Sequence, residues 1–95
     1  MANETVPRIF VLDRGFVVVG EAEVSRDLAL HWHMRRSRTV RVWGTADGLS
    51  QLKDGPLDAT VLDPVVERTT PFRSVLDILH LSPEGVRKWT KSLSE

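Results

Sequence analysis

The stretch Ile9-Phe-Val-Leu-Asp-Arg-Gly-Phe-Val-Val-Val19 decides the fold class. Two runs of β-branched and aromatic residues, 9–12 and 16–19, flank the short segment 13–15, which contains a glycine. This arrangement predicts a β-hairpin. Gly20 follows the second run, where a bulge or bend is the expected reason for a glycine inside a strand. Residues 21–24 are expected to continue that strand.

Alternating apolar and polar side chains predict two more strands farther along the chain. The alternation runs through residues 28–34 and again through 39–43, with a polar turn expected at 35–38 between them. Three further extended segments are expected, at 59–62, 65–69 and 74–81. The last of these also fits a helix, and the sequence leaves the two assignments open.

A short helix is expected inside the chain, over residues 46–53. Thr45 is a suitable cap for its start, and Gly55 with the following proline is suited to end it. Leu49 and Leu52 are expected to face inward.

A second helix is expected at the end of the chain, over residues 83–93. Ser82 predicts its start, because serine is a good N-cap and a proline at the next position suits the first turn. Its apolar stripe consists of Val86, Trp89 and Leu93.

These elements predict an α+β fold that is mainly β. We expect a small bent antiparallel sheet or a partly open barrel of five or six strands, with one short inserted helix and one C-terminal helix. The 95 residues correspond to a single β-rich domain over 8–95, preceded by a flexible arm at 1–7. Because a core of this size is thin, we also expect a homo-oligomer.

Composition narrows the class of protein. The chain has 13 basic and 13 acidic residues, and this balance makes nucleic acid an unlikely partner. It has no cysteine, and neither a signal peptide nor a membrane-spanning run is visible, so we expect a cytoplasmic protein that does not bind a membrane.

The strongest candidate site is Trp43-Gly44-Thr45 with Gly48. Glycines between a strand and a helix let backbone N–H groups point outward together and bind an anion. Trp43 offers a flat face for stacking, and Arg41, two residues earlier on the same strand face, could pair with a phosphate. Alternatively, Gly44 is a turn glycine, Thr45 a cap and Trp43 part of the core.

Two further groups of residues are candidates for binding. Asp63, with Thr60 nearby, could accept hydrogen bonds from a sugar or a base edge, although an Asp-Pro pair also commonly starts a turn. A basic patch is expected from the arginine-rich segment, which could hold a phosphate or an acidic surface, or could keep sheet edges apart. Its members are Arg35, Arg36 and Arg38.

Catalysis and metal binding have little support in the sequence. His31 and His33 share a strand face, but no third ligand stands at a recognisable spacing, so no metal site is expected. No serine lies in a nucleophile-elbow context, and no pair of carboxylates has an adjacent base. We therefore expect a binding protein without a cofactor rather than an enzyme.

One longer pattern resembles a known family. Its first part is the hairpin sequence Val11-Leu-Asp-Arg-Gly-Phe-Val-Val-Val-Gly20. Its second part begins with Arg41-Val-Trp-Gly-Thr45 and continues with Gly48-Leu49, Leu52, Gly55-Pro56, Thr60 and Leu62-Asp-Pro64. Over residues 8–81 this resembles a family of small, functionally uncharacterised phage and prophage proteins, although the arginine-rich segment departs from it. The resemblance implies a phage protein in the host cytoplasm, and it supplies no activity.

Two functions are compatible with these expectations. The first is a non-enzymatic sponge that sequesters a small anionic ligand, such as a cyclic or other nucleotide that signals host immunity. The second is a protein-interaction module that docks on a host or phage protein through the arginine cluster and the terminal helix.

Overall fold

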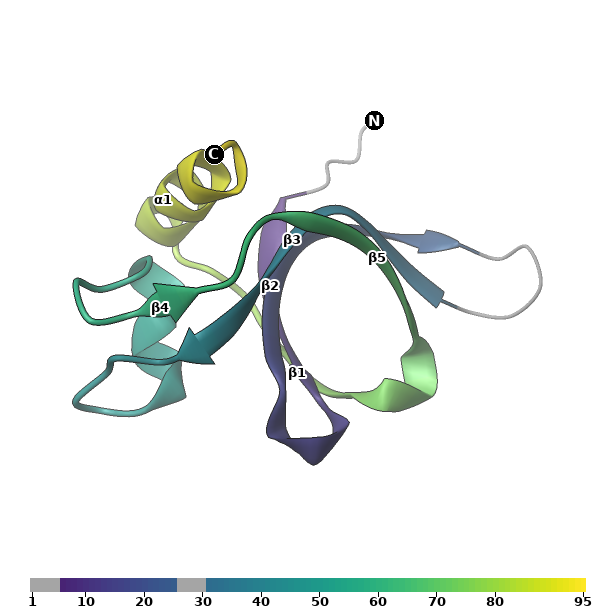
Figure 1. The fold of residues 1–95 in the computed structure, drawn as a ribbon, viewed down its shortest axis with the longest axis horizontal. Helices are drawn as coiled ribbons and strands as arrows, with labels where there is room; N and C mark the ends of the chain where they lie inside the picture. Colours follow the sequence, from purple (N-terminus) through teal and green to yellow (C-terminus); the bar gives the residue numbers. More distant parts are fainter. Residues whose placement is uncertain (1–5, 26–30) are drawn as a thin grey trace.

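The computed structural model describes residues 6–25 and 31–95. Its strands and helix follow the chain as β1 (Pro7–Leu12), β2 (Val17–Ser25), β3 (His31–Val42), β4 (Val61–Leu62), β5 (Val66–Pro71), β6 (Val75–Leu79) and α1 (Pro83–Leu93) (Figure 1). Three 3-10 turns lie between them: η1 (Asp13–Gly15), η2 (Leu49–Asp54) and η3 (Phe72–Ser74).

The six strands form one antiparallel sheet in the order β4-β3-β2-β1-β6, and β5 also pairs with β3. The sheet is strongly bent, so that β3 and β5 arch over one side while α1 lies on the opposite side (Figure 1). The predicted fold class, a bent and mainly β sheet with a C-terminal helix, is confirmed. Residues 74–81, which also fitted a helix, contain the strand β6.

The hairpin predicted from the opening stretch is confirmed as β1 and β2, with Val11 opposite Val17. Gly20 is closely packed: a Cβ there would lie 2.8 Å from the Met34 sulfur and 3.1 Å from the Ser37 Cβ, so those side chains would have to shift. The register between β2 and β3 shifts beside it, between Glu21 and Ala22. The bulge expected near this glycine is therefore present.

The polar turn predicted at 35–38 is wrong, because β3 runs through it without interruption. Glu21 pairs with Arg36 and Ala22 with Met34, which leaves Arg35 as the extra residue of a β-bulge. Strand β3 is hydrogen-bonded along both edges, to β2 on one side and to β5 and β4 on the other. These ladders outweigh the local polarity of the segment. Residues 28–30 of the predicted strand lie outside the described residues.

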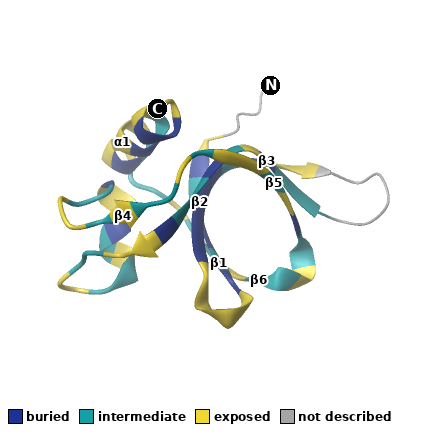
Figure 2. Cartoon of the chain, viewed as in Figure 1, coloured by how far each residue is buried: buried dark blue, intermediate teal, exposed yellow. Residues whose placement is uncertain are grey.

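The buried apolar residues form two cores, to which alternate residues of β1 and β2 contribute, and Figure 2 shows that these two strands are largely buried. The core beside α1 and η2 consists of Ile9, Val17, Val19, Val40, Leu52 and Trp89. The core on the concave side consists of Phe10, Leu12, Val18, Ala22 and Met34. Because β1 and β2 contribute to both cores, the hairpin is the centre of the fold.

The inserted helix differs from the prediction in place and type. It is the 3-10 turn η2, which begins after Gly48, so Thr45 is not its cap. Leu52 is buried and Leu49 packs against the core, as expected. Gly55, with a φ of 118°, ends the turn.

Helix α1 occupies the predicted range, 83–93. The Ser82 hydroxyl accepts a hydrogen bond from the Gly85 backbone N–H, which confirms the N-cap. Trp89 and Leu93 are buried. Among the described residues, no helix is both long and apolar enough to cross a membrane.

The predicted N-terminal arm, residues 1–7, falls mostly outside the described residues. Val6 is exposed, but Pro7 is buried and is the first residue of β1, so the sheet begins one residue inside the predicted arm.

Candidate functional site

Arg41 and Asp63, both predicted site residues, form an ion pair. The Arg41 Nη2 lies 2.6 Å from the Asp63 Oδ1, and the Arg41 Nε donates to the same oxygen at 2.9 Å. The Asp63 main chain is fixed as well, because its N–H donates to the Thr39 carbonyl at 2.9 Å and its carbonyl accepts from the Arg38 Nε at 2.7 Å. Arg41 is therefore engaged by the chain's own carboxylate, although its side chain is largely exposed.

Trp43, Gly44 and Thr60 meet where the loop after β3 crosses the loop before β4. The Thr60 hydroxyl donates to the Trp43 carbonyl at 2.7 Å and accepts from the Leu57 N–H at 2.9 Å. A Cβ at Gly44 would lie 2.3 Å from the Ala59 carbonyl carbon. Gly44 and Thr60 hold this crossing together, whereas the Trp43 side chain is about 40% exposed and is not part of the core.

Beside the predicted anion-binding residues, two backbone N–H groups are bonded within the chain. Those of Ala46 and Asp47 both donate to the Gln51 Oε1, at 3.0 and 3.2 Å. Thr45 and Gly48 lie on either side of them, and Gly48 has open space around its α-carbon. The amide oxygen of Gln51 thus serves as the chain's own acceptor in the segment between Thr45 and Gly48.

The three arginines of the predicted basic patch point to different places. Arg36 forms a fork with Glu21, at 2.8 and 2.6 Å, and this hydrogen bond raises the pKa of Arg36. Arg38 contacts the end of α1. Arg35 is exposed at the bulge, where it lines a hollow of about 170 Å³ with Glu21, Glu23 and His33. The structure therefore does not assemble one arginine patch.

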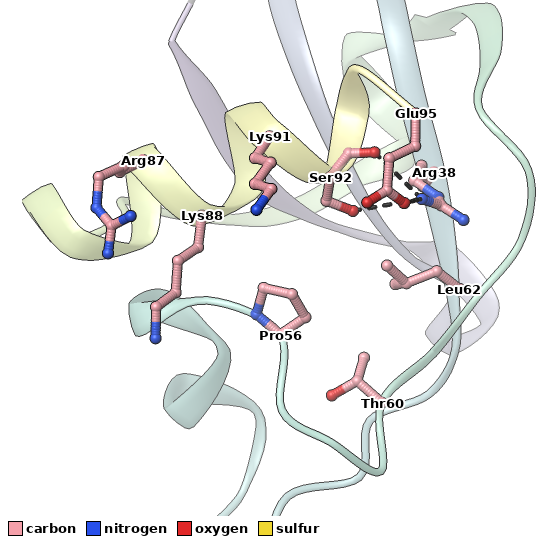
Figure 3. Close-up of a pocket in the computed structure, with 9 residues that line it drawn as sticks. All are labelled: Arg38, Pro56, Thr60, Leu62, Arg87, Lys88, Lys91, Ser92 and Glu95. Atoms are coloured by element: carbon pink, nitrogen blue, oxygen red, sulfur yellow. Dashed lines mark hydrogen bonds and ion pairs between the residues drawn. The ribbon is translucent and has the colours of Figure 1, made fainter.

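A basic groove lies instead between α1 and the segment that comprises β4 and the loop before it (Figure 3). We call it the α1 groove; its volume is about 610 Å³. In the part of the chain that the structure describes, four cationic side chains line it, namely Arg38, Arg87, Lys88 and Lys91, together with one acidic side chain, Glu95. The other lining residues are Pro56, Thr60, Leu62 and Ser92. Thr60 and Arg38 are the only predicted site residues among them.

The cations of the α1 groove are not equally engaged. The Arg38 Nη1 donates to the Ser92 carbonyl at 3.2 Å and lies 3.4 Å from the Glu95 Oε1. Arg87 and Lys88 both contact Glu84, and the hydrogen bond from Arg87 lowers the pKa of that carboxyl. Within the described part of the chain, Lys91 has no ion pair. Figure 3 shows Lys88 and Lys91 extending from α1 toward the side of Pro56.

Sequence reasoning missed the three helix cations, because the apolar stripe of 83–93 drew attention to the buried face. A signal was present: Arg87, Lys88 and Lys91 flank the buried Trp89 on the polar side of the same helix.

Arg68 of β5 is a further residue that the sequence did not reveal. Its Nε donates to the buried Ser37 hydroxyl at 2.9 Å, and its Nη2 donates to the Thr39 hydroxyl at 3.0 Å. Burial lowers the pKa of Arg68, and the nearby Asp63 carboxylate partly opposes this effect. Arg68 braces β5 against β3, and it does not line the α1 groove.

No metal centre is found in the described residues, where no three histidine, cysteine or acidic side chains are grouped to hold an ion. His33 instead contacts Glu67 of β5, with 2.7 Å between the His33 Nε2 and the Glu67 Oε2. This contact joins β3 to β5 on the face opposite Arg68.

Comparison of the chain with protein-family models, with curated protein sequences and with solved structures gave no match. The resemblance to phage proteins therefore stays a prediction, and the α1 groove is interpreted from its own chemistry.

Proposed function

We propose that this chain is a non-enzymatic binding protein that sequesters a small phosphate-bearing ligand in the α1 groove. A nucleotide, which the sequence also favoured, is the first ligand class to test. The site differs from the predicted one: it is built from α1, Arg38 of β3 and the segment 56–62 rather than from Trp43 and the glycines after it.

One observation carries the proposal. Four cations and a single carboxylate line one groove in a chain whose net charge is zero. Lys and Arg side chains gathered around a concave surface focus the potential and favour an anion there. The Lys91 ammonium, which has no ion pair among the described residues, is the natural first contact for a phosphate.

The dimensions of the groove favour a small ligand. About 610 Å³ lies within the range of roughly 300–1,000 Å³ that is typical of small-molecule sites. Pro56 and Leu62 give the wall opposite the cations an apolar part, and the Thr60 hydroxyl adds a polar one. A phosphate held by α1 would therefore leave a ring or base facing Pro56 and Leu62.

The alternative, docking on a protein through the arginine cluster, finds less support. Arg36 and Arg38 are bonded within the chain, to Glu21 and to the end of α1 respectively. Their guanidinium groups are therefore not presented as a flat surface. The cations of α1 could still contact an acidic partner, and the experiment below separates this outcome.

The test is calorimetry of the wild-type chain with inorganic phosphate, nucleoside monophosphates and cyclic dinucleotides. Lys91→Gln should weaken binding of any nucleotide hit about tenfold, as expected for one lost hydrogen bond to a charged group. Arg73→Gln, which removes an exposed cation on η3 outside the groove, is the matched control and should bind normally.

Three results would contradict the proposal or relocate the site. If no phosphate compound binds the wild-type chain, the small-ligand function is wrong and the protein-docking alternative takes its place. If a nucleotide binds and Lys91→Gln has no effect, the α1 groove is not the site. If Arg41→Ala then abolishes binding, the site lies at Trp43, as the sequence predicted.

A further inference from the structure

The chain carries its own anion in the α1 groove. Among the described residues, Glu95 has the only acidic side chain that lines the groove, and its Oε1 lies 3.4 Å from the Arg38 Nη1 (Figure 3). Arg38 is the least exposed of the cations there, with a side chain about 15% exposed, whereas the Glu95 side chain is about 68% exposed. A fixed cation is thus covered by a carboxylate that faces solvent.

Arg38 does not depend on Glu95 for its position. Its Nε donates to the Asp63 carbonyl at 2.7 Å, and its Nη1 donates to the Ser92 carbonyl and hydroxyl at 3.2 and 3.3 Å. These partners are main-chain and hydroxyl oxygens, which carry no net charge. If Glu95 rotated away, the guanidinium would stay in place with its charge uncompensated.

The Glu95 contact is of the kind that a ligand can replace. An ion pair with one largely exposed partner contributes little, because water and salt compete for both groups. A phosphate oxygen offers more, since phosphates and guanidinium groups pair with good geometry and the Ser92 hydroxyl lies beside the same nitrogen. When a phosphate replaces Glu95, Arg38 loses a weak ion pair and gains a stronger one.

We infer that Glu95 is a built-in competitor, and that the anionic group of the ligand binds Arg38 by displacing the Glu95 carboxylate. This inference rests on the proposed function, and it adds regulation to the same site. Arg38 and Ser92 then hold one anionic group at this end of the groove, while Lys91 supplies the first attraction. Affinity is set by competition with the chain's own carboxylate as well as by contacts with the ligand.

The decisive variant is Glu95→Gln, which removes the charge and keeps an oxygen that can accept from Arg38. This variant should bind the tightest-binding nucleotide about two- to fivefold more tightly than the wild type does. That factor corresponds to the free energy of one exposed ion pair. Asp77→Asn is the matched control, because it changes the net charge equally from the exposed strand β6, outside the groove. Its affinity should equal that of the wild type.

A second measurement follows the carboxylate itself. With the chain labelled with carbon-13, the Cδ resonance of Glu95 should shift when the nucleotide saturates the wild-type protein, because the carboxylate leaves Arg38. The Cγ resonance of Asp77 should not shift.

The outcomes separate the inference from the proposed function. Equal tightening in Glu95→Gln and Asp77→Asn is a general charge effect, and it overturns the inference while the site stands. Unchanged or weaker binding by Glu95→Gln, or an unshifted Glu95 resonance, also overturns it. If neither the wild type nor Glu95→Gln binds any phosphate compound, the proposed function fails, and the inference fails with it.

Discussion

The indole Nε1 of Trp89 donates a hydrogen bond of 2.8 Å to the main-chain carbonyl of Leu52. Both side chains are fully buried, so this bond joins α1 to η2 inside the core on the helix side of the sheet. Because Trp89 fixes the rotation of α1, the neighbouring Lys88 and Lys91 are held toward the α1 groove. The groove therefore depends on a residue that does not line it.

The first prediction concerns this bond. Trp89→Phe removes the donor and part of the ring, which leaves a buried carbonyl without its partner and a small cavity. We expect a loss of about 2–4 kcal/mol in the free energy of unfolding, measured in urea. Trp43→Phe is the control, because Trp43 is partly exposed and its ring makes no hydrogen bond among the described residues. A Trp89→Phe chain as stable as the control would contradict the role given to Trp89.

The second prediction compares two glycines that both have a positive φ, Gly44 at 69° and Gly48 at 101°. Alanine at Gly48 would meet open space, so its cost is backbone strain alone, about 1–3 kcal/mol, because a φ of 101° with a ψ of 178° suits essentially only glycine. Alanine at Gly44 would place its Cβ 2.3 Å from the Ala59 main chain. Gly44→Ala should therefore lower the melting temperature clearly more than Gly48→Ala, and equal losses would show that the loop crossing is not closely packed.

The third prediction is a dependence on pH. The hydrogen bond from Arg87 lowers the pKa of Glu84 in the folded chain, so the ionised carboxylate favours folding. This stabilisation is complete above the unfolded-state pKa of about 4.3 and is lost as the pH falls through the lower folded value. Thermal melts should therefore show Glu84→Gln slightly less stable than wild type at pH 7 and equal to it near pH 2.

Much of the fold could be predicted because its signals are local. The opening hairpin follows from two apolar runs around Asp13–Gly15, and α1 follows from Ser82 and Pro83 at its start. The continuity of β3 could not be predicted in this way. Residues 35–38 are polar and suggest a turn, but partners on both edges hold them extended. That pairing involves residues far away in the sequence.

The candidate site was harder to predict for the same reason. Sequence proximity grouped Arg41 and Trp43 with the glycines that follow, and the structure separates their roles. The α1 groove instead brings Arg38 of β3 beside Lys91 of α1, 53 positions later in the chain. Nothing in the sequence near either residue predicts that the two lie on the same groove. Some predicted site residues are in contact, because Asp63 binds Arg41 and the Thr60 hydroxyl binds the Trp43 carbonyl.

The last prediction concerns the buried hydroxyl of Ser37, which joins β3 to β5. It donates to the Val66 carbonyl at 2.8 Å and accepts from the Arg68 Nε at 2.9 Å. Ser37→Ala removes both bonds. The partly buried Arg68 guanidinium then keeps the Thr39 hydroxyl as its hydrogen-bond acceptor among the described residues. We expect a loss of about 1–3 kcal/mol in the free energy of unfolding.

Arg68→Met shows whether the cation is the reason for this loss. Burial lowers the pKa of Arg68, so its charged form is poorly solvated in the folded chain, and an apolar side chain of similar length removes that cost. Urea unfolding of the two single variants and the double variant gives the coupling between the residues. In the Arg68→Met background, Ser37→Ala should cost about 1 kcal/mol less than in the wild type, because no unpaired cation remains. Additive losses would mean that Ser37 acts through the Val66 carbonyl alone.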